Sequence, residues 1–174
     1  MSMSDQVELT NPVELSVGGL SGHLLRRGIH LAMSLLPFLY FEFGENVADW
    51  FSLDLDQVVS AVILIAVAGE TLRLRMGWTI VGQRSYEAKQ VSALAWGALG
   101  VGMVFLLVPD EAYAYPLILS LSLGDPLLGE LRRKGVSTKT VILAGTVGIA
   151  AIWAFCAYSF ATPWLLVPLM APIC

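Results

Sequence analysis

Long apolar stretches separated by short polar segments dominate the chain. They occupy residues 24–43, 58–77, 91–108, 112–130 and 141–160, and a shorter one occupies residues 164–174. Each of the first five is close to the ~20 residues that a helix needs to cross a bilayer. The pattern therefore predicts an all-α fold, a polytopic integral membrane helix bundle with five clear spans and a partial sixth.

The end of the chain predicts a break between helices. No residue from Thr140 onward is charged, and one helix over that whole run would reach ~52 Å, too long for a single crossing. Because the residue before a proline disfavours helix, we expect the break at Thr162–Pro163. The last piece contains Pro168 and Pro172, which predicts either a re-entrant segment or a chain that is part of something longer.

The composition supports a membrane protein and excludes other classes. Hydrophobic residues make up 56% of the chain and charged residues 14%, whereas soluble domains carry about 25% charged residues. A net charge of −4 excludes a basic nucleic-acid-binding surface. Cys156 and Cys174 lie in apolar sequence without neighbouring His or Cys, so we expect neither a disulfide framework nor a zinc site.

The basic residues predict the orientation. All ten Lys and Arg fall at the start of the first stretch or in the two loops on the same side, while the opposite loops carry only acids. Since cytoplasmic loops are rich in Lys and Arg, we expect the N-terminal segment 1–22 and these loops in the cytoplasm. The transmembrane domain then covers 23–174, in the cell membrane of a prokaryote or the endoplasmic reticulum of a eukaryote.

Several ionisable residues lie inside the predicted spans, where each costs about 2.5–3.5 kcal/mol at a helix centre and usually marks function. All are expected at a similar depth in the cytoplasmic half. The alternatives are snorkelling for the two N-terminal arginines, a satisfied polar residue for the histidine, and a structural i,i+3 ion pair for the second helix. The residues are Arg26, Arg27, His30, Glu70, Arg73, Asp125 and Glu130.

The Asp125–Pro126 step predicts a discontinuous fourth helix. Asp followed by Pro is typical of the N-cap and first residue of a new helix, whose exposed amides favour anions. Gly124 and Gly129 allow close approach of a ligand or another backbone, and Asp125 and Glu130 offer the hard oxygen ligands that Mg²⁺ prefers. With the cations Arg132 and Arg133 nearby, this pattern suits a metal-bound polyphosphate; a purely structural kink is the alternative.

These segments resemble a known family, the membrane-bound CTP-dependent lipid kinases. Residues 25–30 (LRRGIH) resemble its Arg-Lys-x-x-His opening, and residues 70–73 (ETLR) its Glu-x-x-Arg motif. Residues 124–130 (GDPLLGE) resemble its Gly-Asp nucleotide segment. The family includes dolichol kinase, phytol kinase and a CTP-using diacylglycerol kinase, and is related to phosphatidate cytidylyltransferases. The cytidylyltransferase signature is absent, which favours the kinase branch, and a C-terminal part of the family domain is expected to be missing.

The resemblance implies transfer of the terminal phosphoryl group of CTP, with Mg²⁺, to the hydroxyl of an isoprenoid alcohol such as a polyprenol, at the cytoplasmic face. Asp125 is then the metal ligand with Glu130 assisting, and Glu70 either fixes Arg73 or deprotonates the lipid hydroxyl. Phosphates are expected at Arg26, Arg27, Arg73, Gly124, Gly129, Arg132 and Arg133, and the role of His30 stays open.

Three alternatives stay open beside the kinase. They are a non-catalytic subunit or pseudo-enzyme of the same fold, a cytidylyltransferase-like lipid enzyme, and a small transporter with ions near the midplane. No nucleic-acid partner is expected, and the sequence is compatible with an oligomer.

Overall fold

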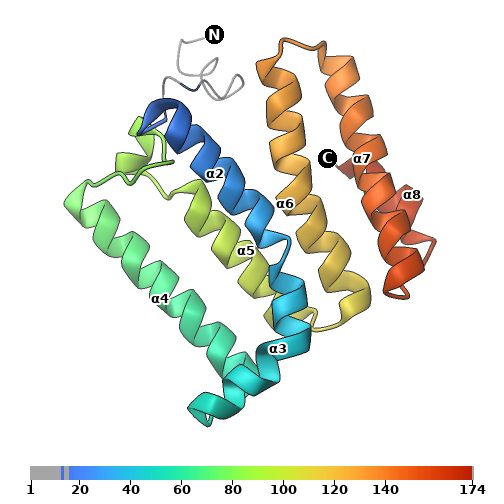
Figure 1. Ribbon diagram of the computed structural model, residues 1–174, viewed down its shortest axis with the longest axis horizontal. Helices are drawn as coiled ribbons and strands as arrows, with labels where there is room; N and C mark the ends of the chain where they lie inside the picture. The colour runs from blue at the N-terminus through green and yellow to red at the C-terminus, as the bar shows by residue number, and fades with distance from the viewer. Residues whose placement is uncertain (1–12, 14–15, 174) are drawn as a thin grey trace.

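The structure is a computed structural model that describes residues 13 and 16–173 (Figure 1). The rest of the predicted N-terminal segment and Cys174 lie outside these residues. The described chain is all-α, as predicted, and its only β feature is an isolated bridge between Ser16 and Arg84. The main helices are α2 (Gly19–Met33), α3 (Leu36–Phe51), α4 (Leu55–Met76), α5 (Ala93–Leu107), α6 (Glu111–Arg133) and α7 (Thr138–Ser159). Shorter elements are η2 (Ser85–Lys89), α8 (Leu166–Met170) and η3 (Ala171–Ile173).

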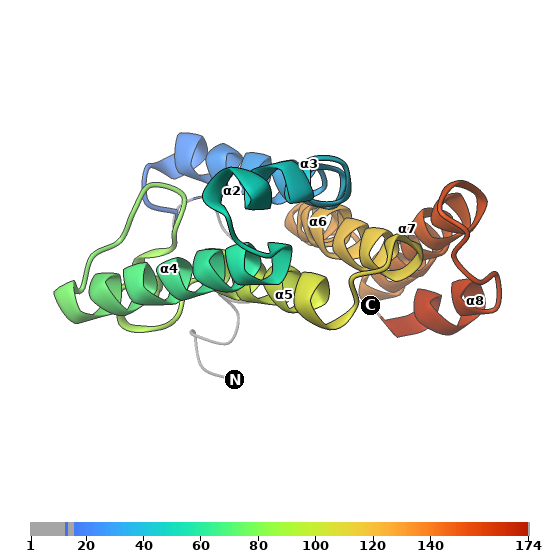
Figure 2. The same cartoon turned by 90° about the horizontal axis from the view of Figure 1, so that it is seen from below.

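The helices form two groups, one made of α2, α3, α4 and α5 and the other of α6, α7 and α8 (Figure 1). Helices α4 and α5 pack side by side, and α6 packs against α2 on one flank and α7 on the other (Figure 1). Seen from below, α2 and α3 form a layer over α4 and α5 (Figure 2). The buried core between the groups contains Met33, Val101, Phe105 and Ile118. This arrangement brings the N-terminal end of α2, the C-terminal end of α4 and the C-terminal end of α6 to the same end of the bundle.

The first apolar stretch is not one helix, contrary to the prediction. The structure divides it into α2 and α3, with Ser34 and Leu35 between them. Pro37 lies in the first turn of α3, where its missing N–H costs nothing but where it cannot continue a preceding helix. The hydroxyl of Ser34 donates to the Leu31 carbonyl at 2.6 Å, which closes the end of α2.

The predicted discontinuity of the fourth helix is also wrong. Helix α6 runs unbroken from Glu111 to Arg133 with Pro116 and Pro126 inside it, so Asp125 is not an N-cap. A proline in a helix removes one hydrogen bond to the carbonyl four residues earlier, but packing against α2 and α7 holds the flanking turns together. At Pro116 the freed carbonyl is that of Ala112, and it accepts instead from Thr162 Oγ1 at 2.6 Å.

The predicted break near the end of the chain is confirmed. Helix α7 ends at Ser159, and residues 161–163, which include Thr162 and Pro163, are non-helical before the short α8 begins at Leu166. Ring stacking between Phe160 and Tyr115 of α6, with centroids 3.9 Å apart, fixes the chain where it turns. The C-terminal segment therefore folds back beside α7 instead of extending it.

Two helices of the described chain are long and apolar enough to cross a membrane. They are α4 and α7, with mean hydropathies of 1.7 and 2.0 over their most apolar windows. None of that window of α4 is buried by the rest of the protein, and Ile65 is 72% exposed. Five spans are not confirmed, because the first stretch is split, α5 has only 15 residues and α6 carries prolines, serines and charges along its length.

Candidate functional site

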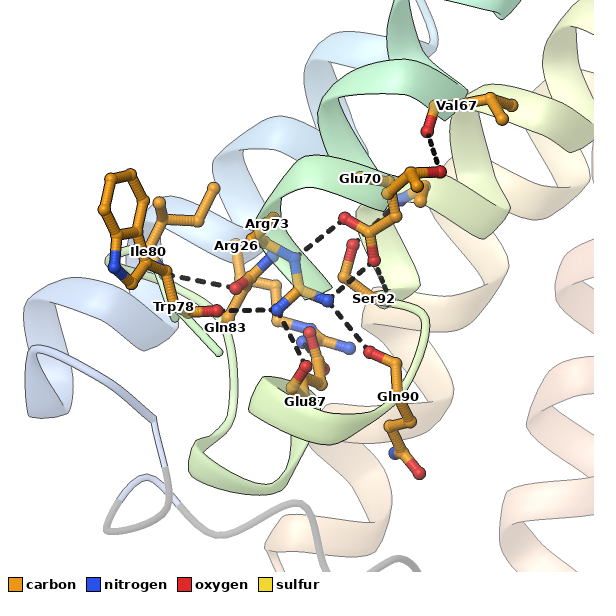
Figure 3. A network of polar contacts seen from close by, with 12 residues as sticks. Arg26, Val67, Glu70, Arg73, Trp78, Ile80, Gln83, Glu87, Gln90 and Ser92 are labelled. Atoms are coloured by element: carbon orange, nitrogen blue, oxygen red, sulfur yellow. Dashed lines mark hydrogen bonds and ion pairs between the residues drawn. The ribbon is translucent and has the colours of Figure 1, made fainter. Parts of the chain in front are cut away.

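The candidate site residues gather at one end of the bundle. Arg26, Arg27 and His30 lie on α2, Glu70 and Arg73 near the end of α4, and Asp125 and Glu130 near the end of α6. The loop 77–92 crosses this end between α4 and α5, and its side chains join those of the helices (Figure 3). The acidic residues of α3 and of the starts of α4 and α6 lie at the opposite end.

Glu70 and Arg73 form the predicted i,i+3 ion pair. Arg73 Nε donates to Glu70 Oε2 at 2.8 Å, and Nη2 donates to Oε1 at 2.7 Å. Oε1 also accepts the backbone N–H of Ser92, the N-cap of α5, at 2.6 Å. Both oxygens of Glu70 are therefore engaged, and the pair fastens α4 to the start of α5.

Arg73 also holds the loop 77–92 through backbone carbonyls. Its guanidinium donates to the carbonyls of Trp78 at 2.7 Å, Glu87 at 2.8 Å and Gln90 at 2.9 Å. Together with the two bonds to Glu70, these bonds use all five N–H groups that an arginine has. The side chain is only 8% exposed. In this structure Arg73 has no donor left for a phosphate, so it positions the loop.

Arg26 connects α2 to the same loop. Its Nη1 donates to Glu87 Oε1 at 2.8 Å, and the Glu87 side chain is 3% exposed. The backbones of α2 and the loop also come close together at Gly22 and Gly82. A Cβ atom on Gly22 would lie 3.0 Å from the Gly82 nitrogen and 2.0 Å from the Val17 carbonyl oxygen, so a side chain would not fit there. The loop is thus tied to α2 on one side and to α4 on the other (Figure 3).

Arg27 connects α2 to α6. It forms an ion pair with Glu130, whose carboxylate also accepts from Arg133 Nε at 3.1 Å. The Arg27 and Glu130 side chains are partly exposed, and Arg133 is more so. The pair therefore lies near the surface, where a polyphosphate can reach the two guanidiniums.

A histidine lies beside these arginines, just before the first apolar stretch. Burial lowers the pKa of His23, and the positive charges of Arg27 and Arg133 lower it further. Its imidazole is therefore held neutral more readily than that of a free histidine, and the positive charge at this position comes from the arginines.

His30 faces Asp125 between α2 and α6. Its Nδ1 lies 3.7 Å from Asp125 Oδ2, beyond hydrogen-bond distance, and has no hydrogen-bond partner among the described residues. The Asp125 side chain is 68% exposed. The Asp125 carboxylate is therefore accessible from outside the protein, and no Lys or Arg side chain of the described residues forms an ion pair with it.

The remaining predicted residues divide into packing and surface positions. Gly124 is buried, and a Cβ atom there would lie 3.3 Å from Ile149 Cδ1, so it serves the contact of α6 with α7. Gly129 lies in the helix interior and is partly buried. Arg132 is exposed at the end of α6.

The two predicted magnesium ligands do not converge. Asp125 and Glu130 are five residues apart on one helix, which turns them ~140° away from each other around its axis. Among the described residues no three His, Cys, Asp or Glu side chains come together to hold a metal ion. Asp125 alone fits Mg²⁺ that arrives on a nucleotide, because such ions keep several waters and use one or two carboxylates plus phosphates.

Glu87 belongs to this group of side chains, but the sequence analysis did not identify it as a candidate site residue. The polar loop that contains it is visible in the sequence as the one sizeable polar segment on its side of the bundle. Its partner Arg26 is 61 residues away, however, and no spacing rule connects the two.

Comparisons with protein-family models, curated proteins and solved structures gave no match, so the resemblance to lipid kinases stays a prediction.

Proposed function

We propose that this protein is an integral membrane lipid kinase that transfers the terminal phosphoryl group of CTP to the hydroxyl of an isoprenoid alcohol. The observation that carries the proposal is the grouping of the three motif segments on α2, α4 and α6 at one end of the bundle. Arg27, Glu130 and Arg133 join α2 to α6 there, and the exposed carboxylate of Asp125 lies five residues before Glu130 on α6. Phosphoryl transfer is mostly positioning and charge stabilisation, which such a group of side chains can supply.

Two features support insertion into a membrane: the exposed apolar surface of the long helices and the distribution of the basic residues. Helices α4 and α7 are long and apolar enough to span, and α4 has large apolar side chains on its outer side with no protein partner. The Lys and Arg residues lie at the end of the bundle that carries the candidate site, and the positive-inside rule favours a cytoplasmic location for an end of this kind. The nucleotide then arrives from water and the alcohol from the bilayer.

Each residue has a separate task in this proposal. Asp125 holds the magnesium ion of the nucleotide, and the ion when bound neutralises phosphate charge. Arg27 and Arg133 exchange the Glu130 carboxylate for phosphate oxygens, which bind guanidinium in the same forked geometry. Glu70 fixes Arg73, and the pair holds the loop 77–92 in place.

The closed ion pairs favour one second candidate, a non-catalytic subunit of the same fold. Glu130 is shared by two arginines and Arg73 has no unused donor, as expected if the charges only join helices. The two candidates differ in one measurable property, which is the binding of nucleotide.

Asp125→Asn tests the proposal. The substitution keeps the size of an exposed side chain in the helix interior, so we expect the melting temperature in detergent to stay within a few degrees of wild type. It removes the charge that a hard divalent ion needs, so Mg²⁺-dependent CTP binding and phosphoryl transfer should be lost. Exposed Glu45→Asn at the opposite end of the bundle is the control. No binding of CTP to the wild type would overturn the kinase proposal and favour the non-catalytic alternative.

A further inference from the structure

A small cavity lies between α2, the loop 77–92 and the start of α5. It has a volume of about 40 Å³, and apolar side chains such as Ile29, Met33 and Leu94 form much of its wall. Glu87 and His30 also line it. On this measure a cavity of about 10–15 Å³ holds one water molecule, so the cavity has room for a hydroxyl group with its first carbon.

Glu87, which lines this cavity, has one carboxylate oxygen without a hydrogen-bond partner among the described residues. Its Oε1 accepts from Arg26, but its Oε2 is buried and has no hydrogen-bond partner among the described residues. Buried polar atoms nearly always have a partner, and a carboxylate oxygen requires a donor. The backbone carbonyl of Glu87 is held by Arg73, so the carboxylate is fixed in place. A hydrogen-bond donor in the cavity would satisfy this oxygen.

A wider hollow on the outside is lined by the same residue, Glu87. It has a volume of about 430 Å³, and Arg26, Glu87 and Ala93 line it as they line the small cavity. Trp96, which is 64% exposed, forms part of its wall. The Arg26–Glu87 pair thus lines both an outer hollow with an aromatic wall and an inner cavity with an apolar one. An elongated amphiphile with a slender polar end matches this shape.

We propose that this cavity binds the hydroxyl end of a long-chain alcohol, which donates its hydrogen bond to Glu87 Oε2 while its chain leaves past Trp96. That the alcohol is the phosphoryl acceptor rests on the proposed function. His30 lines the cavity and its Nδ1 is 3.7 Å from Asp125 Oδ2, so one side chain separates the bound hydroxyl from the carboxylate assigned to the nucleotide's metal. Glu87 is then the residue that selects and positions a hydroxyl.

Competition binding tests the assignment without nucleotide. Purified protein in mixed micelles binds radiolabelled geranylgeraniol, and unlabelled competitors displace it. Geranylgeranyl methyl ether has the same chain but no hydroxyl proton, so we expect it to compete about tenfold or more weakly, the effect of one hydrogen bond to a charged group. Dioleoylglycerol, whose ester groups flank the hydroxymethyl, should also compete weakly. Equal competition by the ether, as expected if only water occupies the cavity, or by the diacylglycerol would overturn the proposal.

Two variants locate the binding. Glu87→Gln keeps an acceptor for Arg26 but turns the second oxygen into a donor, so the preference for alcohol over ether should disappear or reverse. Ala93→Leu fills the cavity from its wall without touching an ion pair and should abolish specific binding. Its matched control is Ala98→Leu on the same helix, which does not line the cavity and should bind like wild type. Wild-type binding by Ala93→Leu would overturn the proposal even if Glu87→Gln fails to fold.

The outcome is independent of the test of the kinase itself. Loss of the preference for alcohol, with Asp125-dependent CTP binding intact, would overturn the cavity assignment and leave the kinase proposal standing. The predicted preference for alcohol, without any CTP binding, would support the cavity assignment and overturn the kinase.

Discussion

Arg27 of α2 pairs with Glu130 of α6, 103 residues further along the chain. The same carboxylate also accepts from Arg133, so one acid pairs with two arginines at the point where two motif segments meet. In the sequence, Glu130 looks like a metal ligand beside Asp125. In the structure it faces away from Asp125 and occupies the guanidiniums that a phosphate would use.

Glu130→Gln should therefore not abolish nucleotide binding. The substitution removes the carboxylate that competes with phosphate for Arg27 and Arg133, so we expect CTP to bind in the presence of Mg²⁺ at least as tightly as in wild type. Because the ion pair is partly exposed, its loss should lower the melting temperature only modestly. Titration of CTP by thermal shift or calorimetry measures both effects. Loss of Mg²⁺-dependent binding, as in Asp125→Asn, would mean that Glu130 is a metal ligand after all.

Arg73→Met should be strongly destabilising. It removes the three hydrogen bonds that join α4 to the loop 77–92 and the two that Arg73 makes to Glu70, and it leaves the Glu70 carboxylate without its cation. Breaking such a buried pair from one side costs roughly 3–5 kcal/mol. Arg73→Lys should recover little, because an ammonium cannot reproduce the fork of a guanidinium.

The control for Arg73→Met is Arg75→Met, two residues along the same helix. Arg75 is exposed, and a surface substitution of this kind usually changes the free energy of unfolding by no more than about 0.5 kcal/mol. Thermal unfolding in detergent compares the two. Equal melting temperatures would show that the loop does not depend on Arg73.

Local rules predicted the parts of this fold that local chemistry decides. The Glu70–Arg73 pair follows from i,i+3 spacing on a helix, and the break at Thr162–Pro163 follows from the restriction on the residue before proline. The same rules failed at Pro126. A proline weakens one hydrogen bond, but packing of α6 against α2 and α7 acts on every turn of the helix, and the sequence does not reveal how strong that packing is.

Long-range pairing limited what the sequence revealed about the site. Arg26 and Arg27 are adjacent, yet Arg26 faces Glu87 of the loop and Arg27 faces Glu130 of α6. Neighbouring helical residues point ~100° apart, so the sequence predicts that their partners differ but not which acids they are. The cavity beside Glu87 depends on that choice and was not predictable.

The charge distribution predicts which side of a membrane each loop occupies. Asp49 is exposed at the acidic end and Lys134 at the basic end, so Asp49→Cys and Lys134→Cys should be labelled from opposite sides of sealed vesicles by an impermeant maleimide. Cys156 is buried and is retained, while Cys174 is replaced by serine in both variants. Labelling of both positions from the same side would refute the orientation and the cytoplasmic location of the site.

Pro126→Ala tests the continuity of α6. In an unbroken helix the new N–H donates to the Ser122 carbonyl, and proline in a helix interior is about 3 kcal/mol less favourable than alanine. Since the neighbouring helices have already adapted to the proline, we expect a gain of up to that amount in the free energy of unfolding. The helical content measured by circular dichroism should not change. If Asp125 instead began a separate half-helix, alanine would lose a favourable first-turn residue and either lower the melting temperature or add helix. Pro116→Ala serves as a comparison in the same helix, because the carbonyl it would satisfy, that of Ala112, already accepts from Thr162. Pro116 is also fully buried, so its substitution opens a cavity and should give no gain. A higher melting temperature of Pro126→Ala than of wild type is therefore the result that supports the hydrogen bond of the continuous helix.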